Sequence, residues 1–186
     1  MLKINRNTVN RYYRLVREKI AAYEEQQMRS FAGEVELDES YFGGYHKGHI
    51  GRSVKSKIPV FGILKRNGKV YTQIVPDVSA RTLKAIVKQR VRRGSIVFSD
   101  SWCSYDGLVF DGYEHIRINH TTVLVEHKRN HINGIESFWS YTKNKLSKFY
   151  GIRAHNFYLY LKEYEFRFNH RSTNLELLIT KIFFKT

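Results

Sequence analysis

Residues 33–40, GEVELDES, alternate apolar and polar side chains, which predicts a β-strand with one buried face. Two further apolar runs follow, KIPVFGIL at 57–64 and KVYTQIV at 69–75, and the residues between them, KRNG at 65–68, are typical of a hairpin. Three successive antiparallel strands are the simplest interpretation. This sheet decides the fold, because every later element has to extend it or pack on it.

Downstream of the hairpin the pattern changes to helices and short strands. Ser79 is a suitable N-cap for a helix whose apolar residues recur at helical spacing, and Gly94 is expected to end that helix. The expected elements are a helix at 79–91, strands at 95–100 and 114–119, and helices at about 131–149 and 156–168. We therefore expect an α/β fold, a mixed sheet flanked by helices.

The chain is strongly basic, with 32 Lys and Arg against 17 Asp and Glu and a net charge of +15. Such a protein more often binds a polyanion than merely displays a solvated basic surface, because released counterions drive the association. Nucleic acid is favoured over anionic membrane, since the basic residues are spread along the chain. A single cysteine, Cys103, excludes an intrachain disulfide, and no apolar leader is visible, so we expect a cytoplasmic, nucleoid-associated protein.

The N-terminal segment, from Asn5 to about Arg29, has the pattern of a basic helix. Its apolar residues recur every three or four positions, and Asn7 or Thr8 is expected to cap it. Arginines occupy the remaining faces. The candidate DNA contacts of this helix are Arg6, Arg11, Arg14 and Arg17.

We expect three parts in the chain: a basic helical segment at 1–31, a main domain at 33–171, and a tail at 172–186 that packs on the main domain. The apolar run LELLITKIFF at 175–184 is too short, and too interrupted by charge, to cross a bilayer. It is expected to form a packed helix or strand.

Two acidic residues lie where strands are able to direct them to a shared site. Asp38 shares a face of the first strand with Glu36, but it is equally well explained as part of a polar strand face, and the pattern does not exclude Glu36 or Glu39. Asp100 ends an apolar run, and groups at the carboxyl ends of strands point into ligand crevices. The alternative for Asp100 is an N-cap of a helical turn beginning at Trp102.

A third acid, Glu136, lies in the helix expected at 131–149. The apolar stripe of this helix is expected to comprise Ile132, Ile135, Trp139 and Leu146. Glu136 lies about 100° from Ile135, at the edge of the stripe, where partial burial is expected. Lys143 comes seven residues after Glu136, so it lies within about 20° of Glu136 around the helix axis. The alternative is an exposed polar face with spaced charges.

A divalent metal site gives these three carboxylates a chemical reason to be gathered. Without a metal they would repel one another, and some would be forced to protonate. Mg²⁺ prefers oxygen ligands, and two such ions about 3.5–4 Å apart activate the attacking oxygen and stabilise the leaving one. Two Mg²⁺ or Mn²⁺ ions, held by Asp38, Asp100 and Glu136, are therefore the expected cofactors.

Two further patterns are weaker. The loop GGYHKGHIGRSVKSK at 43–57 combines glycines with basic residues, and we expect it to lie along a phosphate backbone or to be merely a mobile basic loop. Its candidate DNA contacts are Lys47, Arg52, Lys55 and Lys57. The histidines have irregular spacing, so scattered surface residues are expected in preference to zinc ligands. These are His115, His120, His127 and His131.

Taken together, four segments resemble the DDE transposases of small bacterial insertion sequences. These are VELDESYFGG at 35–44, IVFSD at 96–100, HINGIESFWSYTKNKL at 131–146 and YLKEYEFRFNHR at 160–171. The resemblance is to the group with an acidic triad and a lysine downstream of the glutamate, and it covers about residues 33–171. The motifs are specific as a set, and the 35 residues between Asp100 and Glu136 also match the family.

The resemblance implies a ribonuclease-H-like fold in which Asp38, Asp100 and Glu136 hold the metals. It selects Asp38 over its acidic neighbours, and it implies that Lys143 contacts phosphate near the scissile bond. Water would cut the phosphodiester at the end of the element, and the released 3′-OH would then attack target DNA. The implied partner is double-stranded DNA, both element ends and target, bound by a homo-oligomer and without a membrane.

Members of this group usually begin with a zinc ribbon and a helix-turn-helix. The start of this chain looks like the second helix of that motif, so we expect the segment at 1–31 to be a remnant of it. Two other functions stay open. One is a truncated or inactive remnant that only binds DNA, and the other is a ribonuclease-H-like nuclease without strand transfer.

Overall fold

The computed structural model describes residues 4–27, 30–43, 57–100, 111–118, 131–149 and 152–184. The chain forms two compact units, which we describe separately: Arg29–Lys143, and Met1–Met28 together with Asn144–Thr186. This division joins the N-terminal helix and the C-terminal helices in one unit. The expected boundaries of 1–31, 33–171 and 172–186 stay a prediction.

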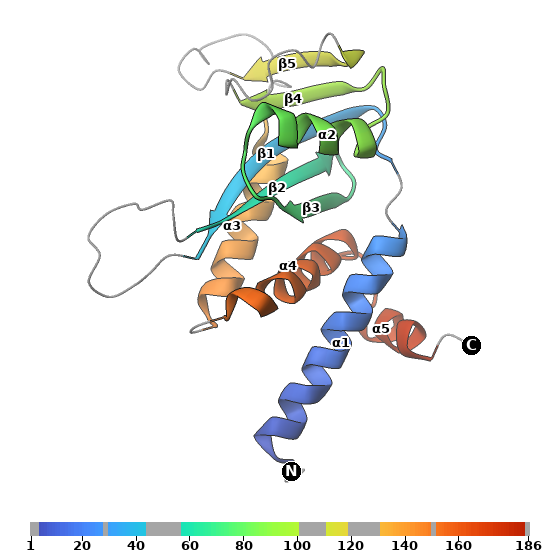
Figure 1. The fold of residues 1–186 in the computed structure, drawn as a ribbon. Coiled ribbons are helices and arrows are strands. Elements are labelled where there is room, and N and C mark those ends of the chain that lie inside the picture. Colours follow the sequence, from blue (N-terminus) through green and yellow to red (C-terminus); the bar gives the residue numbers. More distant parts are fainter. Residues whose placement is uncertain are drawn as a thin grey trace, which may run out of the picture. The chain divides into compact units, whose positions relative to one another are not determined.

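A five-stranded mixed sheet forms the centre of the unit Arg29–Lys143 (Figure 1). Its strands are β1 (Glu34–Phe42), β2 (Ile58–Lys65), β3 (Val70–Ile74), β4 (Ile96–Asp100) and β5 (Glu114–Ile118), in the order β3-β2-β1-β4-β5. β1, β2 and β3 pair antiparallel, whereas β4 runs parallel to β1 and β5 runs parallel to β4. The predicted ribonuclease-H-like sheet of three antiparallel strands followed by parallel ones is confirmed.

The turn between β2 and β3 is the predicted hairpin. Gly68 N donates to Lys65 O at 2.8 Å, and Asn67 has a φ of 56°, which asparagine tolerates better than most residues. The backbone N of Arg66 donates to Glu34 O at 3.0 Å. The turn is therefore fixed to the start of β1, the central strand.

Helix α2 (Ala80–Arg90) covers one face of this sheet (Figure 1). Ser79 caps it as predicted, with its Oγ accepting from Thr82 N at 3.4 Å. The helix ends before the glycine that was expected to stop it, because the next residue is already extended. The Arg90 guanidinium lies 4.7 Å from the centroid of the Tyr71 ring, so α2 is on the face of the sheet that carries Tyr71.

Helix α3 (Asn133–Ser147) covers the opposite face (Figure 1). A Cβ added to Gly62 of β2 would lie 2.5 Å from the Trp139 ring, so glycine is needed where this helix crosses the sheet. Gly62 pairs with Asp38 of β1, and cross-strand partners share a face, so Asp38 lies on the α3 side. The predicted apolar stripe is confirmed, because all of its members are buried: Ile132, Ile135, Trp139 and Leu146.

The second unit contains α1 (Arg6–Gln27), α4 (Ala154–Asn169) and α5 (Leu175–Phe183). The basic helix predicted at the N-terminus is confirmed, but its cap is Asn5, whose Oδ1 accepts from Asn7 N at 2.8 Å. Neither Asn7 nor Thr8 is the cap, because the helix already begins at Arg6 and both residues lie within it. An N-cap side chain reaches the N–H two or three residues ahead, as Asn5 does.

α1 and α4 share buried polar contacts. Glu24 is only 1% exposed, and its two carboxylate oxygens bind His170 Nε2 at 3.0 Å and Asn169 Nδ2 at 2.9 Å. The C-terminal apolar run forms α5, but none of its residues is buried, and Leu177 is 55% exposed. The run is thus a helix, one of the two expected element types, and it contacts α1. Its packing on the main domain stays a prediction.

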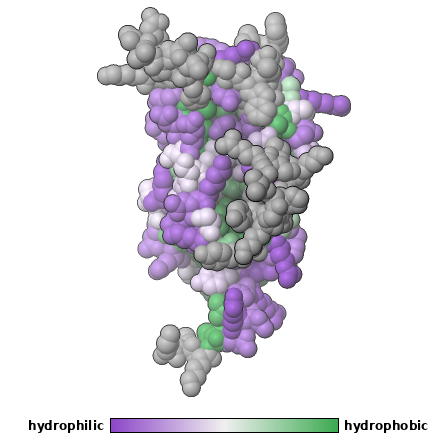
Figure 2. All heavy atoms as spheres, turned by 90° about the vertical axis from the view of Figure 1, so that its left-hand side faces the viewer, coloured by the Kyte–Doolittle hydropathy of each residue, from purple (hydrophilic) through white to green (hydrophobic). Residues whose placement is uncertain are grey.

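The surface is largely hydrophilic on the face shown in Figure 2, where hydrophobic residues show only in small areas. Among the described helices, none has both the length and the apolar character needed to cross a membrane.

Candidate active site

The two central parallel strands bring two of the predicted acids to the same level. β1 and β4 pair in a register that sets Glu36 opposite Phe98. Continuing this register by two residues sets Asp38 level with Asp100, the last residue of β4. Because side chains alternate along a strand, Asp38 and Asp100 project from the same face as Glu36 and Phe98.

The environment of Asp38 opposes its negative charge. Burial, together with the charges of Glu39, Asp100 and Glu136, raises the pKa of Asp38 to about 7. The backbone N of Glu39 donates a hydrogen bond to Asp38 Oδ1 at 2.9 Å, and this bond acts to lower the pKa. β4 and α3 thus bring Asp100 and Glu136 close enough for each to act electrostatically on Asp38 of β1.

The two acidic neighbours of Asp38 have different surroundings. Glu36 is 2% exposed, and its carboxylate is paired with Arg66 Nε at 3.1 Å, between the sheet and α3. Glu39 projects from the opposite face of β1, because adjacent side chains alternate. Asp38 is therefore the acid of this run that lies toward Asp100 and Glu136, which the sequence pattern alone does not reveal.

Glu136 is exposed, whereas partial burial was expected. The buried face of α3 also includes Phe138 and Thr142, both fully buried, and this centres the face on Ile135. At about 100° from Ile135, Glu136 falls outside that arc. It lies at the rim of the helix–sheet interface, where its carboxylate is open to solvent.

Lys143 lies on the same side of α3 as Glu136 and interacts electrostatically with Asp38. Its Nζ is 5.7 Å from the centroid of the Phe42 ring of β1. Partial burial lowers the pKa of Lys143. The negative charge of Asp38 acts to raise this pKa, whereas the positive charge of Lys57 lowers it further. Lys57, a predicted DNA contact, therefore lies within electrostatic reach of Lys143.

The carboxylates fit a divalent cation in their chemistry, although they are not assembled at ligand spacing. Within the described ranges, no group of three or more His, Cys, Asp or Glu could hold a metal ion. Asp38 is nevertheless a half-buried carboxyl flanked by further negative charges, so the Glu39 N–H and Lys143 compensate its ionised form only in part. A cation with oxygen ligands supplies the remaining compensation, and all three side chains offer oxygen.

The histidines have other surroundings. His115 Nε2 lies 2.8 Å from Ser99 Oγ, a contact between β4 and β5, and His131 is exposed. His120 and His127 lie outside the described residues. Also outside them are the loop residues Lys47, Arg52 and Lys55 and the turn expected after Asp100.

A second candidate surface lies within the α1–α4 unit. A groove of about 740 Å³ is lined by residues of both helices. Three of the predicted DNA contacts line it, Arg6, Arg14 and Arg17, whereas Arg11 does not. The groove combines arginines with aromatic rings, a composition that suits phosphate and base contacts.

Arg17 is the most engaged arginine of this groove. Its Nε pairs with Glu163 at 2.7 Å, and its guanidinium lies 3.9 Å from the centroid of the Tyr160 ring. Arg167, which sequence reasoning missed, pairs with Glu163 at 2.8 Å. The signal that identifies Arg167 is its i,i+4 spacing from Glu163, which places both residues on one face of α4.

A mixed sheet with acids level on its adjacent central strands and on the covering helix defines an α/β domain of the ribonuclease-H-like class. The chain belongs to the family of ISXO2-like transposase domains, whose sequence pattern matches residues 30–169. It is therefore a transposase-family protein.

Individual proteins are also similar to this chain. An uncharacterized transposase-like protein of Haemophilus influenzae (strain ATCC 51907 / DSM 11121 / KW20 / Rd) is 45% identical over 113 residues, which are 61% of this chain and 91% of that protein. Among solved structures, the catalytic core domain of BIV integrase aligns over 81% of this chain and 99% of its own, with 13% identity and a TM-score of 0.49. The catalytic domain of Mos1 mariner transposase aligns over 97% and 94%, with 14% identity and a TM-score of 0.44. The family assignment rests on the sequence matches.

Proposed function

We propose that this protein cuts DNA phosphodiester bonds and joins the released 3′-OH to target DNA, as a DDE transposase of a bacterial insertion sequence. The observation that carries the proposal is the environment of Asp38, which interacts electrostatically with Asp100, Glu136 and Lys143 from two other elements. Family membership supports the class of reaction, and the interactions of Asp38 support its location between β1, β4 and α3.

Asp38, Asp100 and Glu136 would hold two Mg²⁺ or Mn²⁺ ions, which when bound activate the attacking oxygen and stabilise the leaving one. Asp38 and Asp100 offer carboxylates at one level of the sheet, and Glu136 offers a third from the rim of α3. Lys143 would bind a non-bridging phosphate oxygen and orient the scissile bond, and its electrostatic interaction with Asp38 supports this role. Lys57 adds a second cation beside it.

Double-stranded DNA is the proposed partner, both as element end and as target. The net charge of +15 supports this, as do the arginines of the α1–α4 groove. Because two ends of an element have to be cut and joined, we propose that the protein acts as a homo-oligomer. Lys47, Arg52 and Lys55 stay predicted DNA contacts.

The test uses the full chain and labelled double-stranded DNA that spans its coding sequence with both flanks, in the presence of Mg²⁺. The variants Asp38→Asn, Asp100→Asn and Glu136→Gln should each abolish cutting and retain DNA binding. Glu39→Gln is the matched control, because it removes an equivalent charge next to Asp38 from the opposite face of β1. If all three site variants cut like the parent, the proposal is wrong.

A pre-cut DNA end bearing a 3′-OH separates the proposed reaction from its rivals. Joined products support strand transfer. Cutting without joining would identify a nuclease, and salt-sensitive binding with neither activity would identify a DNA-binding remnant.

A further inference from the structure

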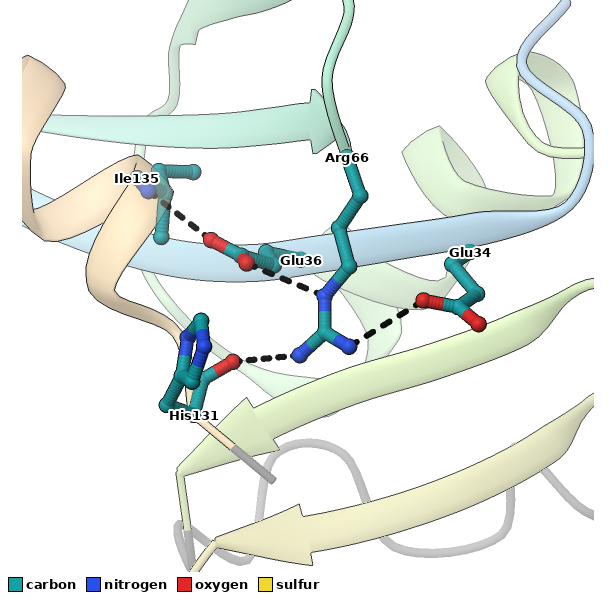
Figure 3. A network of polar contacts seen from close by, with 5 residues as sticks. All are labelled: Glu34, Glu36, Arg66, His131 and Ile135. Carbon is teal, nitrogen blue, oxygen red and sulfur yellow. Dashed lines mark hydrogen bonds and ion pairs between the residues drawn. The ribbon is translucent and has the colours of Figure 1, made fainter. Parts of the chain in front are cut away.

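We propose that Arg66, acting with Glu36, is a positioning residue that sets the distances between Asp38, Asp100 and Glu136. The inference rests on the proposed function of these acids. Arg66 lies on the β2–β3 turn, and none of the three acids is on that turn. Its side chain nevertheless contacts each of the elements that carry them: β1, β4 and the start of α3 (Figure 3).

The start of α3 depends on a cap from the sheet. The residue that precedes the helix is Ile132, which has no side-chain acceptor for the free N–H groups of the first turn. Glu36 of β1 supplies that acceptor, because its Oε2 accepts from Ile135 N at 2.9 Å (Figure 3). The negative charge is also favourable at the positive end of the helix.

Arg66 holds this cap in place and adds a second bond to the same helix start. Its Nε donates to Glu36 Oε1 at 3.1 Å, and its Nη2 donates to His131 O at 2.5 Å (Figure 3). Its Nη1 donates to Glu34 Oε2 at 3.1 Å. One guanidinium therefore joins two positions of β1 to the backbone just before α3.

The same guanidinium also lies on β4. Its Cζ is 3.5 Å from the centroid of the Phe98 ring, and Phe98 is the register partner of Glu36. Glu36 and Phe98 each lie two residues before an acid, Asp38 and Asp100, on the same strand face. Ile135 directly precedes the third acid. Arg66 thus contacts residues two positions before Asp38 and Asp100, and through Glu36 it is linked to Ile135, the residue before Glu136.

Burial indicates that this network fixes geometry more than it adds stability. Glu36 is 2% exposed and the Arg66 side chain 13%, so both charges have lost most of their hydration. A buried ion pair gains little net free energy over apolar packing, whereas its directional bonds determine a single arrangement. The planar fork of arginine serves three acceptors at once, which the single ammonium of lysine cannot do with the same geometry.

The experiment measures Mn²⁺ affinity of the full chain without DNA, by the electron paramagnetic resonance signal of free Mn²⁺. Arg66→Lys and Arg66→Gln should weaken binding on the order of tenfold, as loss of a partner that orients metal ligands typically does. In cutting assays, Arg66→Lys should regain most of the parent rate when Mn²⁺ is raised to saturation. Parent-like Mn²⁺ affinity in both variants would overturn the inference.

A second variant displaces the helix without removing either charge. A Cβ on Gly134 would lie 2.6 Å from Leu64 Cδ2 and 2.8 Å from Glu36 Oε2, so Gly134→Ala should displace the start of α3. It should weaken Mn²⁺ binding as Arg66→Gln does. An unchanged affinity would show that the acids do not depend on this contact, and that result also counts against the inference.

Two controls separate positioning from charge and from stability. Lys65→Gln removes a charge from an exposed side chain on the same turn and should bind Mn²⁺ within twofold of the parent. Leu83→Ala opens a cavity at a fully buried position of α2 and should lower the melting temperature while keeping the parent affinity. If Leu83→Ala weakens Mn²⁺ binding as much as Arg66→Gln, the effect is one of stability and the inference is wrong.

Asp38→Asn and Glu136→Gln distinguish failure of the inference from failure of the proposed function. If these two variants lose Mn²⁺ binding and the Arg66 variants keep it, only the positioning role is wrong. If the two acid variants also bind like the parent, the proposed metal site itself is wrong.

Discussion

At the scale of single residues, Asp38 is a carboxyl that folding makes harder to ionise. Its pKa is 3.8 in the exposed chain and about 7 in the folded protein, chiefly through burial. Between these pH values the folded protein keeps a proton that the unfolded chain has lost. The contribution of Asp38 to stability is therefore fully present below about pH 3.8 and is lost as the pH rises through about 7.

Asp38→Asn should consequently stabilise the metal-free protein at pH 8, because the amide carries no charge that burial and neighbouring acids oppose. The gain in unfolding free energy is at most about 4 kcal/mol, at about 1.4 kcal/mol per pKa unit. It should shrink as the pH falls from 7 toward 4. Urea denaturation of both proteins at pH 5 and pH 8, with a chelator present, measures it. A variant less stable than the parent at pH 8 contradicts the assigned environment.

A divalent ion should reverse the order of these two proteins. Mg²⁺ that binds only the folded parent raises its melting temperature at pH 8 through mass action. Asp38→Asn has lost one of the proposed ligands, so its melting temperature should rise much less. Thermal melts of both proteins, without Mg²⁺ and at Mg²⁺ concentrations raised in 10-fold steps, measure the rise in each melting temperature. Equal shifts in the two proteins would show that the ion binds elsewhere.

Alternation along the strand is what made Asp38 a candidate from the sequence. It placed Glu36 and Asp38 on one face, and the structure has them there. It could not show that Glu36 is paired with Arg66, because that ion pair joins positions 30 residues apart. The exposure of Glu136 was mispredicted for a related reason: the arc of α3 that is buried depends on the sheet it meets.

At the scale of elements, the contact between α3 and β2 needs a residue without a side chain. Gly62→Ala should destabilise the protein by about 1–3 kcal/mol, as overpacking of a filled interface does. The added methyl would lie 2.5 Å from the Trp139 ring and 2.9 Å from Ile135 Cδ1, and neither group belongs to a flexible surface chain. Urea unfolding measures the loss. Stability equal to that of the parent would mean that α3 is free to shift.

The contact between α1 and α4 makes a separate prediction. Glu24→Ala should cost about 2–3 kcal/mol, because it leaves the buried polar groups of Asn169 and His170 without their acceptor. Glu18→Ala on the same helix is the matched control, since the Arg14–Glu18 pair is exposed and should cost less than about 0.5 kcal/mol. Circular dichroism during urea unfolding measures both. Equal costs would contradict the role of Glu24.

Periodicity gave the type of each described element except the run at 175–184, which it left as helix or strand, but it said less about the ends and surroundings of the elements. Strand and helix positions follow from local patterns of two and about 3.6 residues, which the sequence displays directly. The cap of α1 was misplaced because Asn5, Asn7 and Thr8 all have suitable side chains, and only the backbone decides between them. The apolar run did not reveal how fully α5 is covered: the helix contacts α1, but none of its residues is buried.

At the scale of the whole molecule, the mixed sheet could be predicted, whereas the pairing of the helices outside it could not. Three antiparallel strands followed by parallel ones are set by connection lengths and hydrophobic pattern. The union of α1 with α4 depends on contacts such as Glu24 with His170, which are 146 positions apart. Nothing in the local sequence of either helix specifies that pairing.

The basic charge of the chain predicts how strongly salt weakens DNA binding, and which residues carry that dependence. Each phosphate contact that is removed should lower the slope of log affinity against log salt by about 0.9. We expect this for Arg6→Gln and Arg14→Gln in the α1–α4 groove, and for Lys57→Gln beside the acids. Arg81→Gln, on the exposed side of α2, is the control and should keep the parent slope.

Fluorescence anisotropy of one labelled duplex over a series of KCl concentrations measures these slopes for each variant. A double variant of Arg6 and Lys57 should lose the sum of the two single effects, because each phosphate contact contributes its own increment to the salt slope. If only the groove variants change the slope, DNA binding does not involve the proposed active site in this state. If the Arg81 control changes it as much as the others, the charge acts only as a diffuse field, and neither surface is a specific DNA contact.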